Sequence, residues 1–126
     1  MISGLHHLAL ITNDLEKCLS FYRDFIGMTE IRRIYREERN SWKIDLKGHG
    51  FMLEVFTLPG APSRPSYPEA AGLRHLAFAT SNLETLHQAA ISKGYMPEGI
   101  RLDPHTGKHF FFVADPDELP VEFYEA

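Results

Sequence analysis

Glu54 is the first residue whose type does not suit its surroundings. It stands in the middle of FMLEVFTL (residues 51–58), where apolar, β-branched and aromatic neighbours predict a strand that is buried on both faces. Burying an unpaired carboxylate costs several kcal/mol, so Glu54 must be protonated, paired with a cation, bound to a metal ion or directed into a wet cavity. The possible partners of Glu54 elsewhere in the chain distinguish these possibilities.

An internal repeat duplicates this carboxylate. GLHHLALITNDLE, which starts at residue 4, and GLRHLAFATSNLE, which starts at residue 72, share most positions without a gap at an offset of 68 residues. The same offset relates His7 to His75, and Glu54 to Glu122 in LPVEFYE. A chance carboxylate has no reason to recur at the same offset as a histidine. The four residues therefore indicate one two-fold arrangement.

Both repeats show the same predicted order of elements. A capping box of Asn13 and Glu16 opens a helix in the first repeat, and Gly27 ends it; Ser81 and Glu84 open a second helix that ends near Gly94. Before and after these helices we expect strands over 4–11, 31–35, 42–46 and 50–57, and then over 73–79, 97–102, 109–113 and 119–124.

The order βαβββ, written twice, predicts an α+β fold built from two tandem modules. A length of 126 residues suits a single domain, 1–126. We expect module 1 over about 1–58, a linker rich in proline, glycine and serine over about 59–71, and module 2 over about 72–126.

Strand periodicity places Glu54 on the same face as Met52 and Phe56. If the two sheets curl, each repeat contributes the His of its first strand and the Glu of its last strand to a shared cleft. Two imidazoles and two carboxylates suit a divalent transition ion such as Ni²⁺, Zn²⁺, Co²⁺, Mn²⁺ or Fe²⁺. Such an ion would neutralise Glu54.

Four segments of the chain resemble the vicinal oxygen chelate superfamily, which includes glyoxalases, bleomycin resistance proteins and extradiol dioxygenases. These segments are HHLALITNDLEKCLSFY, FMLEVF, LRHLAFATSNL and DPDELPVEFYE. The full His, Glu, His, Glu set is most similar to glyoxalase I, the lactoylglutathione lyase. The resemblance implies that the two tandem βαβββ modules form a cupped mixed sheet around a metal site. It also implies metal ligation by His7, Glu54, His75 and Glu122, with Ni²⁺ or Zn²⁺ expected first.

The resemblance also implies a reaction, a proton transfer through an enediolate on a small hydroxycarbonyl or hemithioacetal. Glu122 would be the catalytic base and Glu54 its pseudo-symmetric partner. The arginine and asparagine that grip glutathione in glyoxalase I correspond here to Ile11 and Leu58. We therefore expect a different small substrate. Arg36 and Lys108 are the candidate residues for binding a substrate anion.

Alternatives remain open from the sequence. Another enzyme of the superfamily, such as an epimerase, a dioxygenase or a thiol transferase, fits the same scaffold, and so does a non-catalytic small-molecule binding module. The two glutamates could instead pair with buried arginines, for which the strands offer Arg33, Arg36 and Arg101.

The composition restricts the partners. Thirteen basic and 17 acidic residues leave a net charge of −4, which disfavours nucleic acid because no basic stripe can displace phosphate counterions. No signal-peptide pattern and no membrane-spanning apolar run occur, and Cys18 is the single cysteine. We expect a cytoplasmic homodimer that acts on a small molecule, with no membrane partner.

Overall fold

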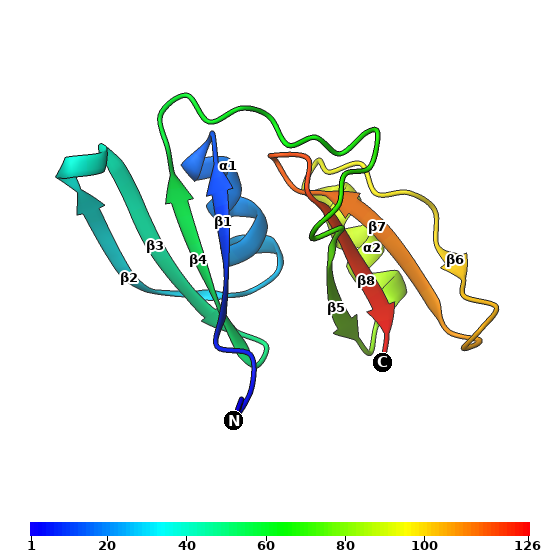
Figure 1. The fold of residues 1–126 in the computed structure, drawn as a ribbon. Coiled ribbons are helices and arrows are strands. Elements are labelled where there is room, and N and C mark those ends of the chain that lie inside the picture. The colour runs from blue at the N-terminus through cyan, green and yellow to red at the C-terminus, as the bar shows by residue number, and fades with distance from the viewer. The chain divides into compact units, whose positions relative to one another are not determined.

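Two units make up the chain in the computed structural model, which describes residues 1–126: Met1–Pro62 and Ser63–Ala126 (Figure 1). Each unit contains one four-stranded mixed sheet, and the elements of each follow the order βαβββ. The α+β fold class is confirmed. None of the helices has the length and apolar composition needed to cross a membrane.

The first unit has the strand order β1-β4-β3-β2, in which β1 and β4 are parallel and the other neighbours antiparallel. A short α-helix continues into a π-helical turn, and Gly27, at φ 88°, follows its last turn as predicted. The elements are β1 (His7–Thr12), α1 (Leu15–Leu19), η1 (Ser20–Phe25), β2 (Thr29–Arg36), η2 (Glu37–Arg39), β3 (Ser41–Gly48) and β4 (Phe51–Thr57).

The second unit repeats this topology with the strand order β5-β8-β7-β6, in which β5 and β8 are parallel. Gly94, at φ 88°, follows the end of its helix, again as predicted. The elements are β5 (Leu76–Thr80), α2 (Leu83–Ser92), β6 (Arg101–Leu102), β7 (His109–Ala114) and β8 (Pro120–Glu125).

The predicted helix caps are wrong by one residue in both repeats. Asp14 and Asn82, rather than Asn13 and Ser81, accept the backbone N–H three positions later, at 3.1 and 3.4 Å. The side chain of Asn13 instead donates a hydrogen bond to the Ala61 carbonyl at 3.2 Å. Both positions in each repeat carry residues that favour N-caps, so the sequence did not distinguish them.

Three predicted strands start at least three residues later than expected. The strand predicted over 4–11 starts only at His7. The strand predicted over 97–102 is reduced to β6, and the strand predicted over 73–79 starts only at Leu76. The carbonyls of Leu73 and Arg74 accept hydrogen bonds from the Arg64 guanidinium, at 2.8 and 3.1 Å, and are not paired with another strand. His75 therefore lies immediately before β5 and not within it.

β4 shows how the first sheet separates its two faces. Leu53 and Val55 are fully buried, together with residues of α1 and η1, whose ribbon lies against one side of this sheet (Figure 1). Met52, Glu54 and Phe56 alternate with them and are half-buried. The prediction of burial on both faces is thus wrong, because the helical segment covers only one face. Glu54 is on the other face.

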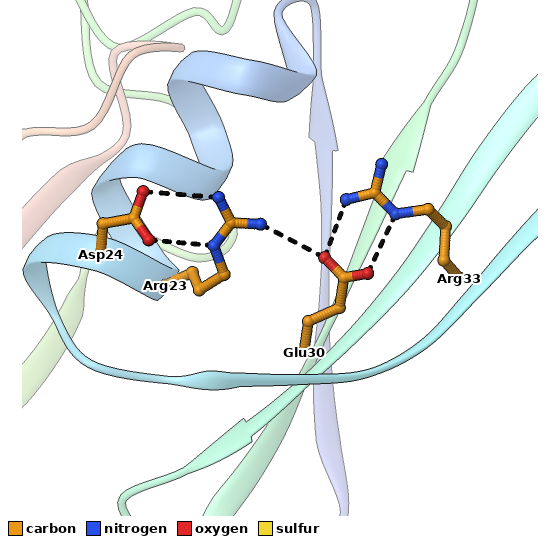
Figure 2. A network of polar contacts seen from close by, with 4 residues as sticks. All are labelled: Arg23, Asp24, Glu30 and Arg33. Carbon is orange, nitrogen blue, oxygen red and sulfur yellow. Dashed lines mark hydrogen bonds and ion pairs between the residues drawn. The ribbon is translucent and has the colours of Figure 1, made fainter.

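An ion-pair network connects η1 to β2 (Figure 2). Arg23 donates to Asp24 at 3.0 Å and to Glu30 at 3.4 Å, while Arg33 donates to both carboxylate oxygens of Glu30, at 2.8 and 3.0 Å. The hydrogen bonds from Arg33 hold the pKa of Glu30 below its ordinary value of 4.5.

We expect Glu30→Gln to lower the free energy of unfolding at pH 7 by about 0.5 to 1 kcal/mol, the range of a partly exposed ion pair. Because folding lowers the pKa of Glu30, its contribution is present above pH 4.5 and is lost as the pH falls through the folded-state value. Urea unfolding at pH 7 and at pH 3 measures this difference. Glu37→Gln, at a position without an ion pair, is the control. An equal loss from Glu30→Gln at both pH values would contradict the expectation.

Candidate functional site

The first unit brings together two of the predicted site residues. His7 opens β1 and Glu54 lies on the adjacent parallel strand β4, where the register pairs His7 with Met52 and Ala9 with Glu54. The Nε2 atom of His7 lies 3.7 Å from Oε2 of Glu54. The two side chains are 39% and 16% exposed, so both face a partly solvated surface of the sheet.

The second unit repeats this arrangement. His75 precedes β5, and Glu122 lies on the adjacent parallel strand β8 opposite Ala77. The distance from His75 Nε2 to Glu122 Oε1 is again 3.7 Å, and the side chains are 30% and 15% exposed. The four predicted residues thus form two equivalent His–Glu pairs. Neither unit alone gathers three or more His, Cys, Asp or Glu side chains in a group that could hold a metal ion.

The geometry of each pair suits two ligands of one ion. A separation of 3.7 Å exceeds hydrogen-bonding distance, so neither imidazole is committed to its carboxylate. Two atoms that each lie ~2.1 Å from one ion in tetrahedral geometry are ~3.4 Å apart, which is close to this value. His75 Nδ1 is buried without a hydrogen-bond partner, and its ring packs edge-on against Phe112. The residues therefore fit a divalent ion that binds through Nε2.

His6 makes a further contact with the first His–Glu pair. Its side chain is exposed, its Nδ1 lies 2.9 Å from Nδ1 of His7, and the two rings meet edge to face. This hydrogen bond occupies the ring nitrogen of His7 that faces away from Glu54. It leaves Nε2 as the atom available to a ligand, in the way that partners of metal-bound histidines orient the ring.

Lys43 is a neighbour of Glu54 that the sequence analysis missed. Its Nζ lies 3.8 Å from Glu54 Oε2 and 2.7 Å from the buried carboxylate of Asp45, which also accepts a hydrogen bond from Arg32 at 2.9 Å. Asp45 is the cross-strand partner of Glu54. The alternation of Lys43 with Asp45 places both on one face of β3, a signal present in the sequence. Glu54 therefore has a protein cation beside it, whereas the only ion-pair partner of Glu122 is His75.

A family model, described as "Glyoxalase/Bleomycin resistance protein/Dioxygenase superfamily", matches residues 4–123. The chain belongs to this superfamily. Its members generally use divalent metals, bind small-molecule substrates and often form dimers. The uncharacterized protein YwkD of Bacillus subtilis is 47% identical to the chain over 126 residues, which cover 99% of this chain and 98% of that protein.

Solved structures agree with the superfamily assignment. A glyoxalase family protein from Enterococcus faecalis is 39% identical, with a TM-score of 0.90 over 97% of each chain. A glyoxalase I mutant from Zea mays has a TM-score of 0.81 over 95% of this chain and 43% of its own length. At 20% identity, this second likeness shows the fold alone.

Buried arginines do not account for the two glutamates of this superfamily member. Arg33 pairs with Glu30, Arg101 pairs with Glu98, and Arg36 lies over the Phe56 ring with its guanidinium carbon 4.7 Å from the ring centroid. Within its own unit, neither Glu54 nor Glu122 forms an ion pair with an arginine. The competing interpretation from the sequence is therefore not supported.

The two candidate substrate-binding residues lie in different surroundings. Arg36 is on β2 and donates to Ser41 Oγ at 3.1 Å, while its guanidinium stacks on Phe56, two residues after Glu54 on the same face. Lys108 lies in the loop before β7. Arg36 therefore belongs to the face that carries the first His–Glu pair.

A pocket of about 190 Å³ adjoins His75 within the second unit. Part of its wall comes from residues 64–70, a segment predicted only as linker. Arg64 fixes this segment through its hydrogen bonds to the carbonyls of Leu73 and Arg74, and Ser66 Oγ donates to the Glu118 carbonyl at 2.9 Å. No pattern in the linker composition indicated this packing.

Proposed function

We propose that this protein is a metal-dependent lyase or isomerase of the glyoxalase I type, acting on a small hydroxycarbonyl or hemithioacetal by proton transfer between adjacent carbons. His7, Glu54, His75 and Glu122 would hold one divalent ion. The observation that carries the proposal is the recurrence of the His–Glu pair in both units, at 3.7 Å and at positions related by the internal repeat.

The donor set favours an enzyme over a passive binding module. A bound divalent ion would act as a Lewis acid on two neighbouring substrate oxygens and lower the pKa of the carbon acid between them. Glu122 would take the proton from one carbon and return it to the next, and Glu54 would hold the pseudo-symmetric position. Lys43, whose Nζ is 3.8 Å from Glu54, would keep that carboxylate in place and leave Glu122 as the more mobile base.

We expect Glu122→Gln to retain the metal ion but to lower kcat by about 10² to 10⁴-fold, because an amide oxygen can act as a ligand but cannot accept the proton. Glu54→Gln is the matched variant and should have the smaller effect. Metal analysis and solvent deuterium incorporation, followed by NMR on a hemithioacetal of methylglyoxal, measure the two properties separately. An unchanged exchange rate in Glu122→Gln would assign the base to another residue.

We also propose that the protein is a homodimer. The four ligands can be supplied by the two pairs of one chain, or by His7 and Glu54 of one subunit with His75 and Glu122 of another. Light scattering on metal-loaded protein measures whether the protein is a dimer. A monomeric mass at full metal content would show that one chain is sufficient.

A further inference from the structure

The pocket beside His75 carries a particular combination of groups. Its walls contain three guanidinium groups and two carboxylates, so that it has one more positive than negative side chain even when His75 is neutral. Aromatic surface comes from Phe112, which also contacts the His75 ring edge-on, and from the exposed Tyr67. Such a pocket suits a ligand with one negative group and an apolar body.

Arg101 is held in a fixed orientation in this wall. Its Nε donates to Oε1 of Glu98 at 3.0 Å, and its Nη2 forms an ion pair with the same oxygen at 2.9 Å. Its guanidinium carbon lies 4.8 Å from the centroid of Phe110 and 5.8 Å from that of Phe112. An arginine stacked on aromatic rings and held by a carboxylate on one edge can present its other edge to an oxyanion.

Arg64 supplies the excess charge. Its Nη2 donates to the carbonyls of Leu73 and Arg74, the two residues before His75, but no carboxylate lies within ion-pair distance of Arg64. The third guanidinium, Arg74, pairs with Glu69 at 3.2 Å. Nε of Arg64 and Nδ1 of His75 are both buried without hydrogen-bond partners. The protein therefore leaves a positive charge and two polar atoms uncompensated at the same pocket.

We propose that this pocket binds the oxyanion group, a carboxylate or a phosphate, of a small molecule whose apolar body lies against Phe112. Arg64 and Arg101 bind the anion, and the body of the ligand extends towards His75 Nε2. The assignment of this pocket as part of the substrate site rests on the proposed function, because the pocket would place the reacting end of the molecule at His75, a proposed metal ligand. It specifies a substrate that is anionic and at least partly apolar.

Binding of simple oxyanions tests the pocket without turnover. The full chain, labelled with ¹⁵N, is titrated with benzoate, phenyl phosphate and neutral benzamide, both as purified and after dialysis against a chelator. We expect the two anions to shift the amide signals of His75 and Phe112 saturably in both samples. Neutral benzamide should bind at least about tenfold more weakly. This factor corresponds to the lower end of the free energy that a hydrogen bond to a charged group contributes. The tighter of the two anions identifies the group as carboxylate or phosphate.

Variants assign the binding to this pocket. Arg64→Met and Arg101→Gln should each weaken anion binding by about tenfold or more. Arg64→Lys keeps the positive charge and should therefore keep most of the affinity for the anion. Arg101→Gln leaves the hydrogen bonds of Arg64 intact, so its effect does not depend on the fold of residues 64–70. Arg23→Gln removes another arginine that is paired with a neighbouring carboxylate, in the other unit, and should change nothing.

The outcomes separate this inference from the proposed function. Anion binding that is absent, equal for benzamide, or insensitive to both Arg64→Met and Arg101→Gln would overturn the pocket assignment. Binding that occurs only in metal-loaded protein and disappears in Glu122→Ala would also overturn it, because the ion and not the pocket would hold the anion. Binding by the pocket in a protein that takes up no metal would support the oxyanion site and refute the metal-dependent function.

Discussion

Replacing His75 by alanine is expected to abolish stoichiometric metal binding, and Glu122→Ala is expected to have the same effect. Each change removes one of four proposed ligands and leaves its partner, 3.7 Å away, without a shared ion. Wild-type protein purified without chelator should carry about one divalent transition ion per site. Plasma mass spectrometry of the purified proteins, with circular dichroism to establish that each variant is folded, measures the effect.

His109→Ala is the matched control for this experiment. His109 and Glu125 form another His–Glu pair in the second unit, with Nδ1 3.5 Å from Oε1, but both side chains are far more exposed than those of the proposed site. The positions 68 residues earlier are Ser41 and Thr57, so this pair has no counterpart in the first unit. Loss of the His109 side chain should leave the metal content unchanged. Full occupancy in His75→Ala or Glu122→Ala would remove the basis of the proposed function.

The hemithioacetal of methylglyoxal and glutathione is expected to be a poor substrate, with kcat/KM below ~10⁴ M⁻¹s⁻¹ even in metal-loaded protein. Ile11 lies four residues after His7 on the same face of β1 and is 54% exposed, so it presents apolar surface near the first His–Glu pair. Leu58 follows the end of β4. Two missing polar contacts, at ~1.5 to 3 kcal/mol each, reduce transition-state binding by at least about a hundredfold.

A gain-of-function variant makes this prediction sharper. Ile11→Arg combined with Leu58→Asn should raise kcat/KM for the glutathione adduct relative to the hemithioacetals of 2-mercaptoethanol and cysteine. Ile34→Arg adds the same charge on β2, in the same row of the sheet face but two strands away from β4, and should not change this preference. Efficient turnover of the glutathione adduct by the wild-type protein would contradict the expectation.

The sequence by itself determined the repeated order of elements and the two His–Glu pairs. Alternation with period two fixes the face on which Glu54 lies, and the offset of 68 residues relates His7 to His75 and Glu54 to Glu122. Glycines at the helix ends act through their own backbone conformation, so Gly27 and Gly94 were also predictable.

Tertiary structure decided the features that depend on residues far apart in the chain. Asn13 could have capped its helix but bonds to Ala61 instead, and the strand of Glu54 is half-buried on one face because the helical segment packs only on the other. Arg64, in a segment that composition marks only as linker, binds the carbonyls before His75 and completes a pocket there. Such contacts are selected by competition among many partners of similar local propensity. Only the folded chain determines which partner is within reach.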